Sequence, residues 1–207
     1  MRKGENIYSL GQWARRLRGL RVLPVILLQL AGNSSNSQSV SSIDRIRLQT
    51  LDRQTYKLSA LHKKLIAVVF LSPECPLCQN YSLVLNRLQA RFGKDLAIAG
   101  IFPGKAVSLA DCRAFREKYN IRFLLLSDTQ KSLVKTLGAR ITPEVFLLDR
   151  ERNILYHGAI DNWVVALGKQ RSKATENYLE DGITGYLNRE PVKVKEMKPI
   201  GCFINDH

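Results

Sequence analysis

Two of the four cysteines stand three positions apart, in the sequence Cys75-Pro76-Leu77-Cys78. A pair at this spacing can ligate a metal ion, attach a haem, form a structural bridge or exchange electrons through a reversible disulfide. Haem attachment requires a histidine directly after the second cysteine, where this chain has Gln79. A structural zinc site requires two further ligands, usually a second closely spaced pair. The chain offers no such pair, because its other possible zinc ligands are isolated from one another: Cys112, Cys202, His62, His157 and His207.

A reversible redox pair fits the residues around the motif best. A structural disulfide between residues i and i+3 closes a very small loop and so removes little entropy from the unfolded chain. A redox-active cysteine needs a helix N-terminus, where unpaired N–H groups and the helix dipole favour the thiolate. Cys75 follows an apolar run at the expected N-cap, and Pro76 takes the first helical position, where no N–H is needed. We therefore predict that Cys75 is the attacking thiolate and Cys78 the resolving thiol, with the neighbouring Glu74 raising the pKa of Cys75.

The segments around this pair alternate between strand and helix patterns. The run at 65–71 is continuously apolar and rich in β-branched residues, which is typical of a strand covered on both faces. A helix is expected to start at the cysteines, and another at Ser108, its predicted N-cap. Together these patterns predict an α/β fold with a mixed central sheet flanked by helices. Its other expected elements are a hairpin within 46–58, strands at 96–102, 123–128, 144–149 and 154–160, a short helix ending at Gly138 and a C-terminal helix near 175–187.

A second motif, Thr142-Pro143, lies directly before the strand expected at 144–149. A strand, Cys-x-x-Cys at a helix start, a βα repeat and Thr-Pro before a strand hairpin resemble the thioredoxin-like redoxins over residues 46–160. The resemblance is to the exported thiol-disulfide oxidoreductase and AhpC/TSA-like branch. It implies a thioredoxin-like fold and a cis Pro143 facing the active-site disulfide, with the backbone of Thr142 pairing with an extended substrate chain.

These features predict a thiol-disulfide oxidoreductase that needs no cofactor. Its partners would be a protein disulfide or dithiol substrate and a thiol electron donor or acceptor, with the direction of electron flow left open. The family pattern is not complete, because Glu74 stands where typical thioredoxins have Trp and the 65–71 strand lacks their buried acid.

A peroxiredoxin-like thiol peroxidase with an antioxidant role is the second interpretation. Peroxiredoxins carry Pro-x-x-x-Thr-x-x-Cys and an arginine that helps to activate the peroxide. Ser72 stands at the threonine position and Arg140 is the candidate arginine, whereas Val68 replaces the proline. The sequence therefore keeps Ser72 and Arg140 as candidate peroxide-site residues.

Two further interpretations remain. Sco-type copper chaperones share the fold and bind copper through two cysteines and a distant histidine, for which His157 is the candidate, although their cysteines are one residue further apart. Alternatively, the chain is a binding domain with a vestigial cysteine pair. Cys112 is expected to be a buried apolar residue. Cys202 is left open as an accessory redox thiol, a partner for Cys112 or a buried residue of the tail, whose sequence KPIGCFI is similar to the ending of some redoxin-domain proteins.

The chain of 207 residues carries a formal net charge of +14. This charge is spread thinly except in residues 1–31, which hold six basic residues and one acidic residue. No compact run of Lys and Arg is interleaved with aromatic residues, so we predict no nucleic-acid partner.

The N-terminal segment has the order of an export signal, with basic residues followed by a short apolar run at 22–32. We predict a signal peptide or membrane anchor at 1–32, a Ser/Asn-rich linker at 33–42, a redoxin domain at 43–162 and a C-terminal helical extension at 163–207. The expected location is periplasmic or otherwise extracytoplasmic, with membrane association if the segment is not cleaved.

Overall fold

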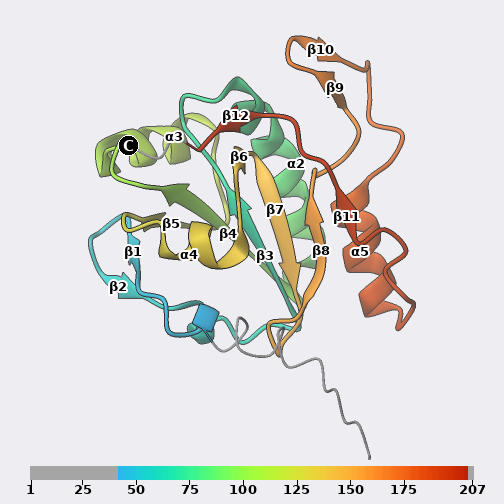
Figure 1. The fold of residues 1–207 in the computed structure, drawn as a ribbon, viewed down its shortest axis with the longest axis horizontal. Coiled ribbons are helices and arrows are strands. Elements are labelled where there is room, and N and C mark those ends of the chain that lie inside the picture. The colour runs from blue at the N-terminus through green and yellow to red at the C-terminus, as the bar shows by residue number, and fades with distance from the viewer. Residues whose placement is uncertain (1–41, 205–207) are drawn as a thin grey trace, which may run out of the picture. The chain divides into compact units, whose positions relative to one another are not determined.

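The computed structural model describes residues 42–204 (Figure 1). The predicted signal or anchor at 1–32 and all but the last residue of the predicted linker lie outside the described residues. Within 42–204, no helix combines the length and the apolar character needed to cross a membrane.

The centre of the structure is a mixed eight-stranded sheet in the order β11-β8-β7-β3-β4-β5-β1-β2. Strands β3, β4 and β5 are parallel, whereas β7 and β1 run antiparallel to their neighbours β3 and β5. The bounds are β1 (Leu48–Thr50), β2 (Thr55–Tyr56), β3 (Leu65–Phe70), β4 (Leu96–Pro103), β5 (Leu124–Asp128), β7 (Glu144–Leu148), β8 (Ile154–Gly158) and β11 (Glu196–Met197). Two small sheets pair β6 (Ile141–Thr142) with β12 (Cys202–Phe203), and β9 (Val164–Ala166) with β10 (Lys169–Gln170).

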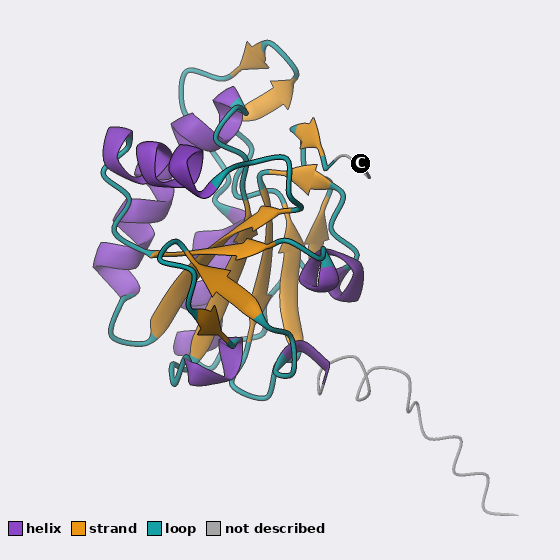
Figure 2. Cartoon of the chain, turned by 90° about the vertical axis from the view of Figure 1, so that its left-hand side faces the viewer, coloured by secondary structure: helices purple, strands orange, loops and turns teal. Residues whose placement is uncertain are grey.

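Helices cover both faces of the sheet, as the side view shows (Figure 2). Their buried residues assign α2 (Pro76–Phe92), α3 (Leu109–Lys118) and α5 (Tyr178–Leu187) to one face, and α4 (Ser132–Leu137) to the other, together with the 3₁₀ turn Leu58–Ala60. Strand β3 joins the two layers because its alternate side chains enter different cores. Leu65, Ala67 and Val69 pack beneath α2, while Ile66, Val68 and Phe70 pack on the α4 side.

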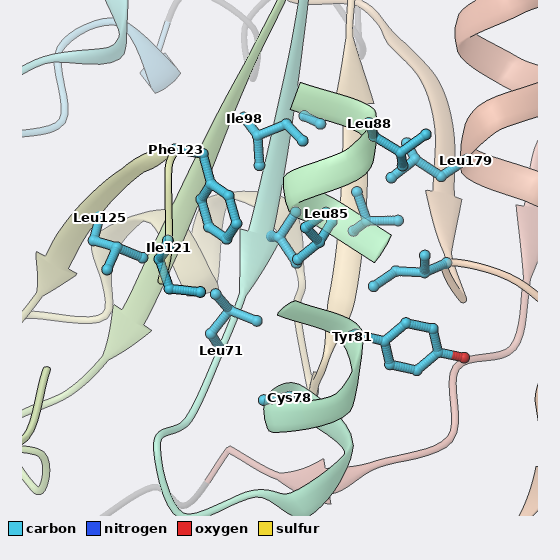
Figure 3. Close-up of a cluster of buried hydrophobic side chains, with 14 of the residues drawn as sticks. Leu71, Cys78, Tyr81, Leu85, Leu88, Ile98, Ile121, Phe123, Leu125 and Leu179 are labelled. Atoms are coloured by element: carbon cyan, nitrogen blue, oxygen red, sulfur yellow. The ribbon is translucent and has the colours of Figure 1, made fainter. Parts of the chain in front are cut away.

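The first core lies between α2 and the sheet (Figure 3). Cys78, Tyr81, Leu85 and Leu88 recur at helical spacing and are buried on the face of α2 that meets the sheet. The redox motif therefore lies on a helix whose position is held by apolar packing along its length.

The predicted α/β architecture is confirmed, including the N-terminal hairpin, the doubly buried β3 and the helix that begins after Cys75. Ser108 is the N-cap of α3, in a capping box with Asp111. The C-terminal helix starts at Tyr178, three positions later than predicted, and packs on the sheet through Leu179 and Ile183. The four short strands after residue 163 were not predicted, because two- and three-residue strands carry no detectable periodicity.

The N-terminus of α4 is held by a residue outside the helix. Lys131, at the N-cap, makes no side-chain capping bond. Instead, the carboxylate of Asp128, only 1% exposed, accepts the backbone N–H groups of Ser132, Leu133 and Val134 at 2.9, 2.8 and 3.1 Å. Asp128 thus satisfies three N–H groups that have no partner within the helix.

Replacing Asp128 with alanine leaves these buried donors without an acceptor. We expect Asp128→Ala to lower the free energy of unfolding by about 1–3 kcal/mol, measured by urea denaturation. Asp52→Ala, at an exposed turn position, serves as the control and should change it by less than about 0.5 kcal/mol. Equal effects of the two substitutions would contradict the capping role of Asp128.

Candidate active site

The first cysteine occupies the junction between β3 and α2. Cys75 is the N-cap of α2 in an extended conformation, and Pro76 follows in the first turn, as predicted. The connecting loop is tightened by the N–H of Cys75, which donates to the Ser72 carbonyl at 3.2 Å. The N–H of Ser72 in turn donates to Cys78 Sγ at 3.4 Å. The loop therefore holds Cys78 Sγ, while the backbone N–H groups of Leu77 and Cys78 at the start of α2 favour the Cys75 thiolate.

The two thiols lie in different electrostatic surroundings. The pKa of Cys75 is lowered from 9.0 to about 5, chiefly by a hydrogen bond from the Cys78 thiol, against the opposing effect of burial. The pKa of Cys78 is raised well above its ordinary value, first by burial and then by its contact with Cys75. At neutral pH one sulfur is therefore a thiolate and the other a thiol.

The predicted partner loop lies against the first sulfur. The Thr142–Pro143 peptide bond is cis, as the resemblance implies. Thr142 is buried, and its carbonyl oxygen lies 3.3 Å from Cys75 Sγ, where it accepts a hydrogen bond when Cys75 is protonated. The structure thus brings Thr142, which is distant in the sequence, to Ser72, Cys75 and Cys78, which lie within seven residues of one another.

The loop is supported by a buried acid that the sequence analysis missed. Glu144 follows the cis proline as the first residue of β7, and its Oε2 accepts the N–H groups of Arg140 and Ile141 at 2.9 and 3.3 Å. These bonds bend the chain back on itself just before Thr142. A carboxylate at the first position of an otherwise apolar strand was the available signal.

A second missed group braces α2 from its other side. The Tyr81 hydroxyl donates to Asp161 at 2.6 Å, and the same oxygen accepts the Trp163 N–H at 2.8 Å. The Tyr81 and Trp163 rings pack edge to face, with centroids 5.7 Å apart. Trp163 therefore packs on the helix that carries the cysteines, as well as belonging to the C-terminal extension. Because Tyr81 lies one turn after Cys78, this cluster fixes the cysteine-bearing turn.

The remaining candidates are distributed as follows. Arg140 is exposed, and its described contacts are made by its backbone. Glu74 is also exposed, and the expected rise in the pKa of Cys75 is not found, because that pKa is lowered by the thiols of Cys78 and Cys202 and by backbone N–H groups. His157 stacks on Phe146, which belongs to the core on the face opposite α2, so it points away from the cysteine pair.

Cys112 is fully buried, and burial raises its pKa to about 12. Within 42–204, no group of three or more His, Cys, Asp and Glu side chains is placed to hold a metal ion.

The third cysteine of the site comes from the tail. Cys202 lies on β12, paired with β6, and its Sγ donates to Cys75 Sγ at 2.7 Å. None of the four cysteines forms a disulfide, and Cys202 contacts Cys75 rather than Cys112.

Comparison with known proteins supports this description. A crystal structure of a hypothetical protein from Sinorhizobium meliloti is similar, with a TM-score of 0.69 and 27% identity over 77% of this chain and 89% of that chain. An uncharacterised protein from Geobacillus kaustophilus gives a TM-score of 0.69 and 20% identity over 78% and 88%. A secreted Mycobacterium tuberculosis disulfide oxidoreductase gives 0.51 and 16% over 73% and 98%. No curated protein sequence matches the chain.

The mixed sheet, the dithiol at the start of α2 and the cis proline opposite it define a redoxin of the thioredoxin-like fold. The model of the AhpC/TSA family matches residues 42–157. The chain therefore belongs to the AhpC/TSA family.

The lowered pKa of Cys75 predicts a titration at acidic pH. In the reduced protein, the thiolate should be present above about pH 5 and lost as the pH falls through that value. Cys112 and Cys202, with pKa values raised to about 12 and 11, should not contribute there. We expect the ultraviolet absorbance of thiolate to show one step with a midpoint near pH 5.

Substitution of Cys78 tests which group lowers the pKa of Cys75. Cys78→Ala removes the largest contribution to the lowered pKa, so the midpoint should move to higher pH. Cys78→Ser, which keeps a hydroxyl donor, should move it less. Cys112→Ala should leave it unchanged, and an unchanged midpoint in Cys78→Ala would refute the assignment.

The Glu144 bonds predict a positioning role. Glu144→Ala should lower the free energy of unfolding by about 1–3 kcal/mol, since two backbone donors lose their acceptor. It should also slow disulfide exchange at Cys75, because the loop that carries Thr142 loses its support. Glu144→Gln retains a carbonyl acceptor and should restore most of both properties, as measured by urea denaturation and by the rate of exchange. Failure of glutamine to restore either property would show that hydrogen bonding to this loop is not what matters.

Proposed function

We propose that this protein catalyses thiol-disulfide exchange, with Cys75 as nucleophile and Cys78 as resolving thiol. One observation carries the proposal. At one helix N-terminus, beside the Thr142–Pro143 turn, the pKa of Cys75 is lowered while the pKa of Cys78 is raised. Such a site generates a thiolate at neutral pH and keeps the second sulfur protonated until it is needed.

The reaction follows from this asymmetry. The Cys75 thiolate attacks one sulfur of a substrate disulfide, forming a mixed disulfide and releasing the other substrate sulfur as a thiolate. Cys78 then gives up its proton and attacks Cys75 Sγ, which releases the second substrate thiol and closes the Cys75–Cys78 disulfide. Two electrons pass from the protein pair to the substrate. A thiol donor restores the dithiol, and the reverse sequence oxidises a substrate dithiol.

Disulfide exchange is favoured over peroxide reduction because the described groups that lower the pKa of Cys75 are thiols and backbone N–H groups, with no cation among them. A peroxidase site requires a cationic group beside the attacking thiolate to bind and polarise the peroxide. Arg140 is exposed, and its backbone is engaged with Glu144 and the tail. Ser72 is near the nucleophile, because its carbonyl accepts the N–H of Cys75 at 3.2 Å.

We also propose that the redoxin domain acts outside the cytoplasm. The support is the order of residues 1–32, in which a basic segment precedes a short apolar run. The partners would then be exported proteins whose cysteines pair in an oxidising compartment.

The test of the activity is disulfide reduction by the full chain, supplied with a thiol donor and assayed with insulin as substrate. Cys75→Ser should abolish turnover, because no other cysteine has a lowered pKa. Cys78→Ser combined with Cys202→Ser should make one mixed disulfide with the substrate and stop. Cys112→Ser, which alters a buried thiol of α3, is the control and should retain activity.

The same variants separate the alternatives when they are assayed with a hydroperoxide. Rapid peroxide turnover by the unmodified chain, with little insulin reduction, would establish the peroxidase function instead. Insulin reduction that survives Cys75→Ser would refute the assignment of the nucleophile.

A further inference from the structure

The described part of the C-terminal tail reaches the active site. After α5 the chain forms β11 along the outer edge of β8 and then crosses to β12, which lies at the end of α2 beside β6 (Figure 1). In this pairing Cys202 stands opposite Thr142, and Phe203 opposite Ile141. The tail therefore occupies the edge of the loop that precedes the cis proline.

The tail is held there as an added antiparallel strand. The Ile204 N–H donates to the Arg140 carbonyl at 2.9 Å, and the Thr142 hydroxyl donates to the Cys202 carbonyl at 3.4 Å. This is the way in which an extended peptide binds to an exposed strand edge, with backbone bonds giving affinity and side chains giving specificity.

Two glycines let the tail approach closely. A Cβ on Gly201 would lie 2.2 Å from the Thr142 carbonyl oxygen, and one on Gly158 would lie 1.8 Å from the Met197 carbonyl oxygen. Gly158 also has a φ of +123°, which side-chain-bearing residues rarely adopt. Both the tail and its binding surface are therefore shaped for this contact.

We propose that the tail is an internal substrate of the site and that Cys202 exchanges with the Cys75–Cys78 disulfide to form a Cys75–Cys202 disulfide. The proposal rests on the proposed function, since it needs the redox-active pair. The chain would then hold its oxidising equivalent in one of two interconvertible disulfides, one internal to α2 and one that locks the tail in the groove.

The exchange is balanced without an external reagent. The Cys202 thiolate attacks Cys75 Sγ, the Cys75–Cys78 bond breaks, and Cys78 leaves as a thiolate that takes up the proton lost by Cys202. One disulfide replaces another, so no net oxidation occurs. The sulfurs need little movement, because Cys202 Sγ already lies 2.7 Å from Cys75 Sγ.

The docked tail also blocks access of a substrate disulfide to Cys75. Cys75 is only 1% exposed, too little for a protein disulfide to reach it. The tail borders two hollows: one of about 220 Å³ is lined by Tyr81, Pro143 and Ile200, and another of about 170 Å³ by Ser72, Thr142 and Phe203. Because the tail forms a wall of each, its release would join them into one groove along Pro143. The substrate that replaces it would be an extended segment with a cysteine opposite Thr142.

The experiment is to oxidise the reduced full chain with one equivalent of glutathione disulfide and to map its disulfides without reduction. We expect a link between the peptide that contains Cys75 and the peptide that contains Cys202. Cys78→Ser should give this link alone, Cys202→Ser should give only Cys75–Cys78, and Cys112→Ser should behave like the unmodified chain. A Cys202 that stays a free thiol, or that links two chains, would overturn the proposal.

A matched glycine pair tests the docked strand. Gly201→Ala places a methyl group against the Thr142 carbonyl, whereas Gly185→Ala on α5 meets nothing closer than 3.7 Å. We expect Gly201→Ala to form about tenfold less of the Cys75–Cys202 disulfide. It should also reduce insulin faster, because the tail no longer competes with the substrate for the groove. Gly185→Ala should change neither. Equal behaviour of the two variants would refute the docking.

These outcomes separate the two proposals. If Cys202→Ser and Gly201→Ala reduce insulin at the rate of the unmodified chain and Cys202 remains free, the internal substrate is wrong while the oxidoreductase function stands. If no variant reduces insulin and no disulfide forms at Cys75, the proposed function itself has failed.

Discussion

The fold depends on one requirement, which is that a helix must begin at the point where a buried strand ends. Strand β3 is completely enclosed, so its last residues leave the sheet at a defined place and direction. Helix α2 starts at Pro76, six positions after the last residue of β3, and apolar contacts along one face fix its axis. The free N–H groups at its end then lie where Cys75 and Cys78 need them. A loop could not hold the sulfurs this closely, because it lacks both the dipole and the packing.

The Thr142–Pro143 turn is brought to the site by β7, which runs antiparallel to β3 in the same sheet. Strand β7 pairs with β3 so that Glu144 lies opposite Phe70, which brings the Thr142–Pro143 turn to the end of α2. Cys75 and Thr142 therefore meet because two adjacent strands share a register. Sheet pairing, rather than a direct bond between the two segments, determines the distance between nucleophile and turn.

Much of this arrangement could be predicted from the sequence, for identifiable reasons. The apolar run of β3, the N-cap position of Cys75 and the Thr142–Pro143 motif are local signals, and each led to the correct element. The roles of Glu144, Asp161 and Cys202 could not be predicted in this way. Their partners lie far away in the chain, and a single acid or cysteine has no periodicity to detect. The sequence makes Cys202 a candidate redox thiol, yet only the pairing of β12 with β6 shows which sulfur it contacts.

The pairing of β11 with β8 has a consequence for how the chain can be divided. Strand β8 would otherwise be the outer strand of the sheet, with backbone groups open to pairing with another molecule. The segment after residue 163 covers that edge, and Leu179 and Ile183 complete the core beneath it. A fragment that ended at residue 162 would expose both an unpaired strand and apolar surface. It should therefore be prone to self-association, and the extension serves as a protective cover for the sheet.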